Sequence, residues 1–459
     1  MILAAGKGTR MKSSRPKVLH ALAGRTIIEH VLRTADGLRA DRSVVVIGHG
    51  ADEVRTALGS RPALKFVVQS PQLGTGHALL QAEPELAGQT GTVLLLYGDV
   101  PLLQVNTLMR LVEHHRKARA TATVLTMEMA DPYGYCRIVR DKKGQIARIV
   151  EERDASADQR KIREVNSGIY ALDLKPLFGS LHQLATDNAQ GEYYLTDLIS
   201  MYRQAKLKVE TLLMESPEEL RGVNSRLDLA ELGAELRKRK NREIMLAGVT
   251  LEDAATTYVD SDVTIGPDTI LGPGVVLQGT TTIGEGCHIQ AGCRLTNARI
   301  GPRVIVLDHS VIVDSRVDAG ARIGPFSHIR PLSEVGENAH VGNFVELKKT
   351  TLGRGSKANH LAYLGDATIG EGANIGAGTI TCNYDGVNKN QTVIEDGAFI
   401  GSDSQLVAPV RIGKGAYVAA GSSITKDVPA DALGVARGRQ VNVPDWAAAR
   451  RAKRAKGQS

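Results

Sequence analysis

The sequence has few cysteines and no long apolar run, and both features narrow what the protein can be. Its 459 residues include four cysteines, Cys136, Cys287, Cys293 and Cys382, without a C-x-x-C pair or a companion histidine spacing. This pattern disfavours zinc and a disulfide framework, and it fits a reducing cytosol. No segment approaches 18 uninterrupted apolar residues, and no charged leader precedes an apolar stretch. We expect a soluble, cytoplasmic protein without membrane insertion.

The start of the chain lacks the two commonest nucleotide-binding motifs, G-x-x-x-x-G-K-[ST] and G-x-G-x-x-G, but it has another glycine-rich loop. Residues 3–17 read LAAGKGTRMKSSRPK, directly after a short apolar start. Gly6 and Gly8 allow backbone N–H groups to approach an anion closely, and Arg10 and Lys17 supply positive charge. A turn that only joins a strand to a helix explains the glycines but not these cations. The stretch resembles the signature of the sugar-1-phosphate nucleotidyltransferases.

The positive charge of the chain is confined to its carboxyl terminus. The formal net charge is +7, and residues 437–459 hold seven Lys or Arg and one Asp, which leaves about +1 for the rest. A nucleic-acid partner would have only this tail to bind. We therefore expect a solvated basic tail and no nucleic-acid partner.

Hydrophobic patterns divide the chain into three parts. In residues 1–226, short apolar runs at 44–47, 66–68 and 93–96 alternate with helical patterns at 26–35, 51–58, 77–87 and 105–118. This alternation predicts a Rossmann-like α/β domain with a mostly parallel sheet. Residues 227–247 carry apolar side chains at helical spacing with charges between them, and they predict a long connecting helix. Residues 248–459 would form the third part, which ends in the basic tail.

The third part has an aliphatic residue at about every sixth position. The series runs from Ile265 through Leu271 and Leu277 to Leu352, resumes to Ile375, and continues from Ile394 to Ile424. Neither an α-helix nor ordinary strand pairing has a period of six, whereas hexapeptide repeats are typical of a parallel β-helix. The pattern resembles the left-handed kind, with three hexapeptides per coil. The stretch TCNYDGVNKNQ after Ile375 breaks the period and is expected to leave the coil as a functional loop.

A carboxylate follows the strongly apolar run at 93–96. Tyr97, Gly98 and Asp99 come directly after it, and ligands bind beyond the carboxyl ends of strands in an open α/β sheet. Asp99 could instead cap a turn, but pyrophosphoryl chemistry needs a hard cation with oxygen ligands. We therefore favour metal binding for Asp99.

The first and third parts together resemble the family of bifunctional bacterial N-acetylglucosamine-1-phosphate uridyltransferases/glucosamine-1-phosphate acetyltransferases. This resemblance implies Mg²⁺ held by Asp99 and Asn224, with Arg10 and Lys17 as catalytic cations on the triphosphate of UTP. It implies a wider set of nucleotide and sugar contacts. They are Leu3, Ala4, Ala5, Gly6, Lys17, Gln69, Gly74, Thr75, Tyr97, Gly98, Asp99, Cys136, Glu151, Asn166 and Asn224.

Two positions depart from the family pattern. Cys136 stands where the family has a sugar-contacting glycine, and a required positive φ would not tolerate it. Only Met1 and Ile2 precede Leu3, where the family has several more apolar residues, so we expect a short first strand.

Basic and polar residues in the repeat region indicate a second site. Lys348 follows Arg330 by three hexapeptides, the length of one coil, so the two side chains should stack and could bind phosphate. A lone histidine such as His360 is usually structural or solvated, but an acetyltransferase needs a base for its substrate amine, and histidine suits neutral pH. Glu346 is a candidate to orient it.

The resemblance gives these residues roles. His360 would be the general base, and glucosamine 1-phosphate would bind to Arg330, Lys348, Tyr363 and Asn374. The acetyl-coenzyme A site would comprise Ala377, Asn383, Tyr384, Ser402, Ala420 and Arg437. Coenzyme A would lie between neighbouring copies of the β-helix in a homotrimer.

Three functions therefore compete. The first is bifunctional: glucosamine 1-phosphate is acetylated by acetyl-coenzyme A, and the product reacts with UTP to give UDP-N-acetylglucosamine and pyrophosphate. The second is a single-activity sugar-1-phosphate nucleotidyltransferase with a structural β-helix, which His360, Asn383 and Tyr384 argue against. The third is a non-enzymatic assembly subunit, which the intact Arg10, Lys17 and Asp99 argue against.

Overall fold

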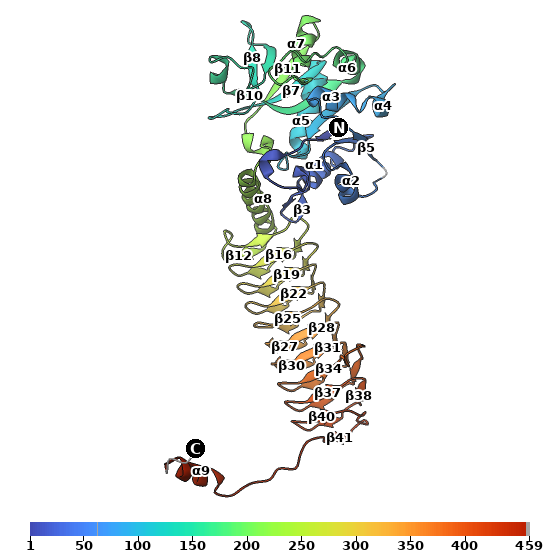
Figure 1. The fold of residues 1–459 in the computed structure, drawn as a ribbon, viewed down its shortest axis with the longest axis vertical. Coiled ribbons are helices and arrows are strands. Elements are labelled where there is room, and N and C mark those ends of the chain that lie inside the picture. The colour runs from blue at the N-terminus through green and yellow to red at the C-terminus, as the bar shows by residue number, and fades with distance from the viewer. Residues whose placement is uncertain (62, 456–459) are drawn as a thin grey trace. The chain divides into compact units, whose positions relative to one another are not determined.

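The protein is described by a computed structural model that covers residues 1–61 and 63–455, so the end of the basic tail lies outside the described residues. The chain divides into two compact units, Met1–Arg239 and Lys240–Ser459 (Figure 1). The boundary falls within helix α8 (Arg226–Leu246), close to the predicted connecting helix.

The first unit is built on one mixed sheet in the order β11-β7-β10-β6-β1-β4-β5, with β8 paired to β10 and β9 paired to β8. Its strands are β1 (Ile2–Ala4), β4 (Ser43–Ile47), β5 (Leu64–Val68), β6 (Thr92–Tyr97), β7 (Ala122–Glu128), β8 (Arg137–Arg140), β9 (Ile146–Val150), β10 (Glu164–Asp173) and β11 (Val209–Met214). Strands β2 (Ala21–Leu22) and β3 (Arg25–Thr26) form a separate pair. The central strands β6, β1, β4 and β5 are parallel, whereas β10 runs antiparallel to β6 and β7.

The sequence patterns at 26–35, 51–58 and 105–118 each form a helix, the pattern at 77–87 does not form a single one, and the helices at 174–181 and 197–204 were not predicted. They are α1 (Ile27–Asp36), α2 (Ala51–Leu58), α3 (Thr75–Leu80), α4 (Glu83–Leu86), α5 (Val105–Ala118), α6 (Leu174–Leu181) and α7 (Asp197–Gln204), with 3₁₀ turns η1 (Thr9–Met11), η2 (Lys17–Leu19), η3 (Gln159–Lys161) and η4 (Pro217–Leu220). The single helix predicted at 77–87 is wrong, because α3 ends at Leu80 and α4 begins anew at Glu83. Pro84 lies in the first turn of α4, where it has no N–H to extend the preceding helix.

Alternate strand residues serve two cores, one on each face of the sheet. Ile2, Ala4 and Val45 pack with α1, α2 and α5, whereas Leu3 and Val46 pack with α3, α6 and α7. Both faces are therefore covered by helices, which leaves the ends of the strands for ligands.

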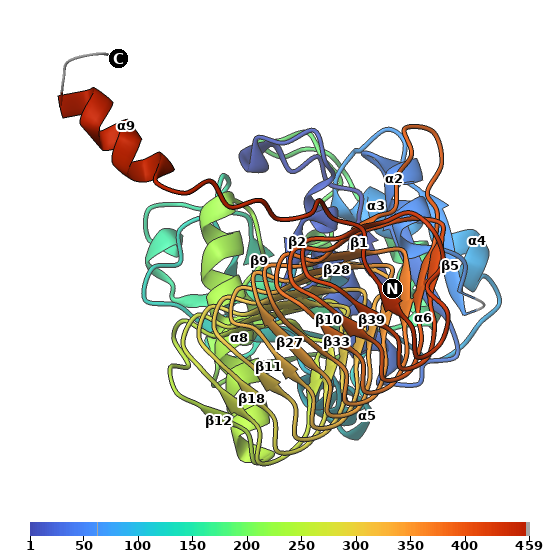
Figure 2. The ribbon, with the colours of Figure 1, turned by 90° about the horizontal axis from the view of Figure 1, so that it is seen from below.

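The second unit is a three-sided parallel β-helix, seen along its stack in Figure 2. The first face contains β12 (Thr250–Leu251), β15 (Ile270–Leu271), β18 (His288–Ile289), β21 (Ile305–Val306), β24 (Arg322–Ile323), β27 (His340–Asn343), β30 (Lys357–His360), β33 (Asn374–Ile375), β36 (Phe399–Ile400), β39 (Tyr417–Val418) and β41 (Leu433–Gly434). The second contains β13 (Tyr258–Val259), β16 (Val276–Gln278), β19 (Arg294–Thr296), β22 (Val311–Val313), β25 (His328–Ile329), β28 (Glu346–Lys348), β31 (Tyr363–Gly365), β34 (Ile380–Cys382), β37 (Gln405–Val407) and β40 (Ser423–Ile424). The third contains β14 (Thr264–Ile265), β17 (Thr282–Ile283), β20 (Arg299–Ile300), β23 (Arg316–Val317), β26 (Glu334–Val335), β29 (Thr351–Leu352), β32 (Ala367–Ile369), β35 (Thr392–Ile394) and β38 (Val410–Ile412).

Each coil places its aliphatic residues directly above those of the coil before. Ile329, Leu347 and Leu364 are paired neighbours on the second face, and all three are fully buried. Ile375 pairs with Ile400 across a longer stretch of sequence than one ordinary coil, because the predicted loop leaves the coil between them. The predicted fold class, a nucleotidyltransferase-like α/β domain followed by a hexapeptide β-helix, is confirmed. After β41 the chain is largely exposed and ends in the described part with helix α9 (Trp446–Ala455), which is exposed throughout.

Candidate active sites

The glycine-rich loop follows β1 at the carboxyl end of that strand. Leu3 and Ala4 belong to β1, and Ala5 is buried directly after it. Gly6 is exposed, and a Cβ atom built there would meet nothing within 4 Å. The backbone of the loop therefore faces open space, as an anion-binding loop requires.

The side chains of Lys17 and Arg10 contact the side-chain oxygens of Asp99 and Asn224. The Lys17 ammonium donates to Asp99 Oδ2, and Lys17 Nζ lies 3.3 Å from Asn224 Oδ1. The Arg10 guanidinium donates to the same Asn224 oxygen at 3.0 Å. The structure thus brings together four predicted residues that are up to 214 positions apart in the sequence.

Glycine at position 8 allows this arrangement. Gly8 has φ of +60°, which L side chains rarely adopt, and a Cβ atom there would lie 2.7 Å from Lys17 Cβ. The loop therefore folds closely against the stem of Lys17 and directs its ammonium towards Asp99.

Asp99 and Asn224 supply one carboxylate and one amide oxygen. Hard oxygen ligands in small number suit Mg²⁺, which usually keeps several waters and takes further oxygens from substrate phosphates. Within the described residues, no group of three or more His, Cys, Asp or Glu side chains could hold a metal ion. The pair therefore fits a magnesium ion delivered with a phosphate substrate better than a closed protein cage.

The predicted uridine contacts include residues that follow β6 and β5, two strands of the same sheet that have β1 and β4 between them. Gly98 follows β6, and its N–H donates to Leu3 O at 2.9 Å. Gln69 follows β5, and its Nε2 donates to Gly74 O at 2.9 Å. Gly74 has φ of +107°, and Thr75 begins α3 directly after it. Burial raises the pKa of Tyr97, to which Thr75 is hydrogen-bonded.

Glu151 is held by donors on both oxygens. Cys136 Sγ donates to Oε2 at 2.9 Å, and Thr196 Oγ1 donates to Oε1 at 3.0 Å. Burial raises the pKa of Glu151 and also that of the Cys136 thiol. Thr196 carried no sequence signal for this role, because its contact with Glu151 joins distant parts of the chain.

Cys136 does not violate the backbone requirement raised by the sequence. It is not among the residues with positive φ, so a cysteine is tolerated there without strain. Its carbonyl accepts from Asn166 N at 2.9 Å, which places Cys136 and Asn166 side by side. The side-chain amide of Asn166 is hydrogen-bonded within the same strand, because Nδ2 donates to Tyr170 Oη and Oδ1 accepts from Gly168 N.

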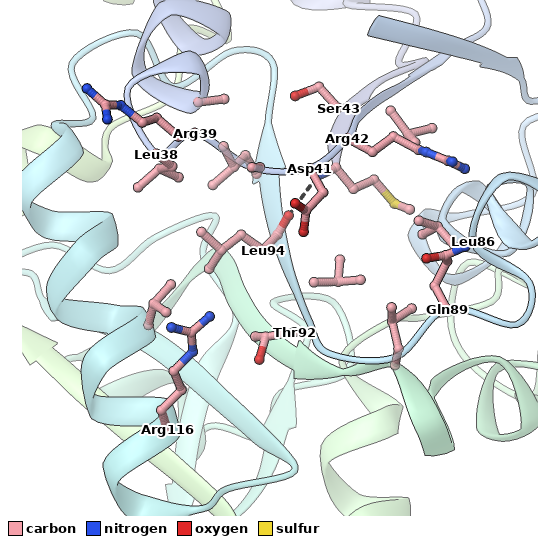
Figure 3. A pocket seen from close by; sticks show the side chains of 18 of the residues that line it. Leu38, Arg39, Asp41, Arg42, Ser43, Leu86, Gln89, Thr92, Leu94 and Arg116 are labelled. Atoms are coloured by element: carbon pink, nitrogen blue, oxygen red, sulfur yellow. Dashed lines mark hydrogen bonds between the residues drawn. The ribbon is translucent and has the colours of Figure 1, made fainter. Parts of the chain in front are cut away.

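A cavity of about 1100 Å³ lies at the opposite ends of the central strands (Figure 3). Asp41, Arg42, Leu94 and Arg116 are among its lining residues, and none of the predicted nucleotide contacts lines it. It adjoins the start of β1, which has three residues, whereas β4 has five and β6 has six. The cavity therefore lies at the amino end of the short strand β1, whereas the glycine-rich loop follows the carboxyl end of that strand.

In the second unit, a small pocket of about 300 Å³ gathers four cations around one carboxylate. It is lined by Arg330, Pro331, Leu332, Lys348, Lys349, Asp366 and Lys389. Lys348 Nζ donates to Asp366 Oδ2 at 3.0 Å. Burial acts to raise the pKa of Asp366, but hydrogen bonds from Lys348 and Asn383 lower it below its ordinary value. The net positive charge suits a phosphate dianion.

Sequence reasoning missed Lys389, Lys349 and Asp366. Lys389 lies in the loop that leaves the coil, and contact with the Lys348 ammonium lowers its pKa. Loops outside the repeat carry no period from which a side-chain direction could be predicted. The only available signal was that this lysine belongs to the loop already expected to be functional.

His360 is exposed at the end of β30, and its Nδ1 lies 2.8 Å from Asn343 Oδ1. If Nδ1 carries the proton and donates to Asn343, the lone pair of Nε2 is free to accept a proton. Glu346 was the candidate to orient His360, but its Oε1 accepts from Arg330 at 2.7 Å. The observed partner of His360 is Asn343, which lies one coil before it on the same face.

The remaining predicted residues of this unit lie on nearby coils. Tyr363 starts β31 and Asn374 starts β33, while Asn383 Nδ2 donates to Asp366 Oδ2 at 2.5 Å. Arg437 donates to Ala420 O at 2.8 Å, and Gly421 N donates to Ser402 O at 2.8 Å. Tyr384 is exposed in the loop, and Ala377 accepts from Asp403 N. These contacts link the predicted coenzyme A residues of successive coils.

Among the residues that the structure describes, no helix is both long enough and apolar enough to cross a membrane.

Comparison with known proteins gives matches along almost the whole chain. Residues 1–165 match the model of the MobA-like NTP transferase domain, and residues 262–297 and 391–426 match the bacterial transferase hexapeptide model. The chain is 50% identical over 459 residues to the bifunctional protein GlmU of Koribacter versatilis, which covers 99% of this chain and 97% of that protein. It is 51% identical over 446 residues to the bifunctional protein GlmU of Syntrophotalea carbinolica, covering 97% and 96%. The protein of the same name from Pelobacter propionicus is 48% identical, with 97% of each chain covered.

Proposed function

Because the chain belongs to the family of the bifunctional GlmU proteins, we propose that it makes UDP-N-acetylglucosamine in two transfers. The β-helix unit transfers an acetyl group from acetyl-coenzyme A to glucosamine 1-phosphate. The first unit then transfers a uridylyl group from UTP to the product and releases pyrophosphate. One observation carries this proposal: about half of all residues are identical to these relatives across both units.

His360 is the proposed general base of acetyl transfer. The hydrogen bond between Nδ1 and Asn343 fixes the ring, so that Nε2 can take a proton from the substrate amine as the amine attacks the thioester carbonyl. The thiol of coenzyme A leaves. Since His360 is exposed, substrate reaches it without a change in the core.

The cation pocket is the proposed site for the phosphate of glucosamine 1-phosphate. Arg330, Lys348 and Lys389 would bind its oxygens, and Asp366 fixes Lys348 by a hydrogen bond. Tyr363, on the strand paired with that of Lys348, and Asn374, on the first face of the β-helix, would position the sugar. The acetyl-coenzyme A contacts proposed from the resemblance are Ala377, Asn383, Tyr384, Ser402, Ala420 and Arg437.

Uridylyl transfer needs no protein nucleophile, because a phosphate oxygen of the sugar attacks the α-phosphorus of UTP and pyrophosphate leaves. Arg10 and Lys17 would hold the triphosphate, and positioning with charge neutralisation supplies most of the rate. Asp99 and Asn224 would hold Mg²⁺, which neutralises phosphate charge when bound. Glu151, fixed by Cys136 and Thr196, and Asn166 would contact the N-acetylglucosamine group.

We propose that the protein works as a homotrimer in the cytoplasm. One corner of the β-helix carries an exposed stack of His309, Phe326 and Phe344, with ring centroids 5.3 and 5.5 Å apart, and Leu361 on the next coil. Phe344 is 56% exposed and Leu361 is 62% exposed. An apolar ridge of this kind favours burial against another copy, and the four free cysteines favour a reducing compartment.

The experiment supplies the purified chain with glucosamine 1-phosphate, acetyl-coenzyme A, UTP and Mg²⁺, and it measures free thiol and pyrophosphate separately. Release of both products is expected. Pyrophosphate from added N-acetylglucosamine 1-phosphate, without thiol from glucosamine 1-phosphate, would instead support the single-activity nucleotidyltransferase. Thiol without pyrophosphate would refute the uridylyl activity.

A further inference from the structure

In this structure, side-chain cations contact the two oxygens to which we assign Mg²⁺. Lys17 Nζ donates to Asp99 Oδ2 and lies 3.3 Å from Asn224 Oδ1. Arg10 Nη2 lies 3.0 Å from that same Asn224 oxygen. A divalent ion that coordinated both oxygens would have to replace these contacts.

The ion pair is partly buried. The side chains of Lys17 and Asp99 are only 13% and 17% exposed, so solvent screens their attraction less than on an open surface. The backbone at Gly8 lies close to the stem of Lys17, because a Cβ atom built there would be 2.7 Å from Lys17 Cβ. The lysine nevertheless ends in a flexible four-carbon stem with a point charge, which can turn to another anion within reach.

We propose that Lys17 is a built-in counter-cation that occupies the magnesium position until a nucleoside triphosphate arrives. The triphosphate offers Lys17 and Arg10 an anion of higher charge, and their departure from Asp99 and Asn224 frees the oxygens for the metal. The free protein then binds divalent cations weakly, and it binds them well together with the nucleotide. Because binding free energies are coupled reciprocally, the metal strengthens nucleotide binding by the same factor.

This inference rests on the proposed magnesium site, and its consequence is an order of binding. Metal would enter with the nucleotide and not before it. Without Lys17, Asp99 loses the ammonium group that donates to it, so the site would accept a divalent ion from solution.

The test uses Mn²⁺ as the probe and the longitudinal relaxation rate of water protons as the readout, since this rate rises when Mn²⁺ binds a slowly tumbling protein. The full-length wild type should give little enhancement alone and a large one after UTP is added. Lys17→Met should give the enhancement without UTP, with Mn²⁺ affinity raised by about tenfold or more. Lys7→Met removes the same charge from an exposed position of the same loop and should behave as wild type.

Equal Mn²⁺ affinity of the wild type and Lys17→Met, in the absence of nucleotide, would overturn the inference. So would an equal rise in Lys7→Met, because the effect would then be one of general charge. Asp99→Asn in the Lys17→Met background separates this from the magnesium assignment itself. That double variant should lose the enhancement of the relaxation rate. If the enhancement persists, Asp99 is not a ligand of the metal ion. Far-ultraviolet circular dichroism of each variant checks that the chain is folded.

Discussion

The role of His360 gives the sharpest prediction. The side chain is exposed, and its hydrogen bond goes to Asn343 at 2.8 Å. His360→Ala should therefore lower stability by no more than about 1 kcal/mol, the typical net value of one hydrogen bond. Loss of a general base should lower acetyl transfer by roughly 10²- to 10⁴-fold, which corresponds to about 2.7–5.5 kcal/mol of barrier.

Asn343 supplies the matched comparison. Asn343→Ala removes the ring's partner but leaves the base, so acetyl transfer should fall by only about 2- to 12-fold, the equivalent of one hydrogen bond. The double variant should be no worse than His360→Ala alone, since Asn343 acts through the ring.

Two assays on one sample measure these effects. Thiol release from acetyl-coenzyme A with glucosamine 1-phosphate reports acetyl transfer, and pyrophosphate release from UTP with N-acetylglucosamine 1-phosphate reports uridylyl transfer. The second rate should stay near wild type in all three variants. Equal loss of both rates would indicate misfolding, and multiplicative effects of the two substitutions would refute the orienting role of Asn343.

Three further predictions test other parts of the two sites. Lys389→Ala should raise KM for glucosamine 1-phosphate roughly 10- to 100-fold by removing a charge-assisted phosphate contact, and an unchanged KM in steady-state kinetics would remove Lys389 from the site. Gly365→Ala would place a Cβ atom 2.4 Å from the Tyr363 hydroxyl oxygen; the displaced tyrosine should lower acetyl transfer by up to about 100-fold without changing pyrophosphate release, and full acetyl activity would contradict this. Burial raises the folded-state pKa of Glu151, so the folded state binds more protons and wild-type stability should fall as pH rises from about 4.5 through that pKa. In urea titrations from pH 4.5 to 8, Glu151→Gln should gain stability relative to wild type as pH increases, and a pH-independent difference would show that Glu151 titrates normally.

The sequence predicted the repetitive parts of the fold well, because packing there is periodic. A coil of the β-helix requires an aliphatic residue at each face, so the period of six is visible without any knowledge of contacts. Helices α1, α2 and α5 were predicted closely, since each has one apolar face. The antiparallel strand β10 was not foreseen, because its position depends on pairing with β7 and β6, which lie much earlier in the chain.

The sequence predicted which residues belong to the candidate sites, but it did not predict which of these residues contact one another. The contacts among Lys17, Asp99 and Asn224 join three distant segments of the chain, and no local pattern indicates which oxygen receives which cation. Asn343 could have been found, because it precedes His360 by one coil. Glu346 was the residue proposed to orient His360, but its carboxylate accepts a hydrogen bond from Arg330, and the His360 ring contacts Asn343.

The detour between Ile375 and Ile400 has a consequence for how such proteins can change. The chain leaves the coil, contributes Lys389 to the cation pocket, and returns to pair Ile400 with Ile375 as if no residues had been added. The pairing register in this unit is set by the stacking of each coil on the one before, and it does not depend on the number of residues in the coil. A corner of the β-helix can therefore gain or exchange a binding loop while every other coil keeps its partners, so new ligand preferences can arise in this scaffold by insertion alone.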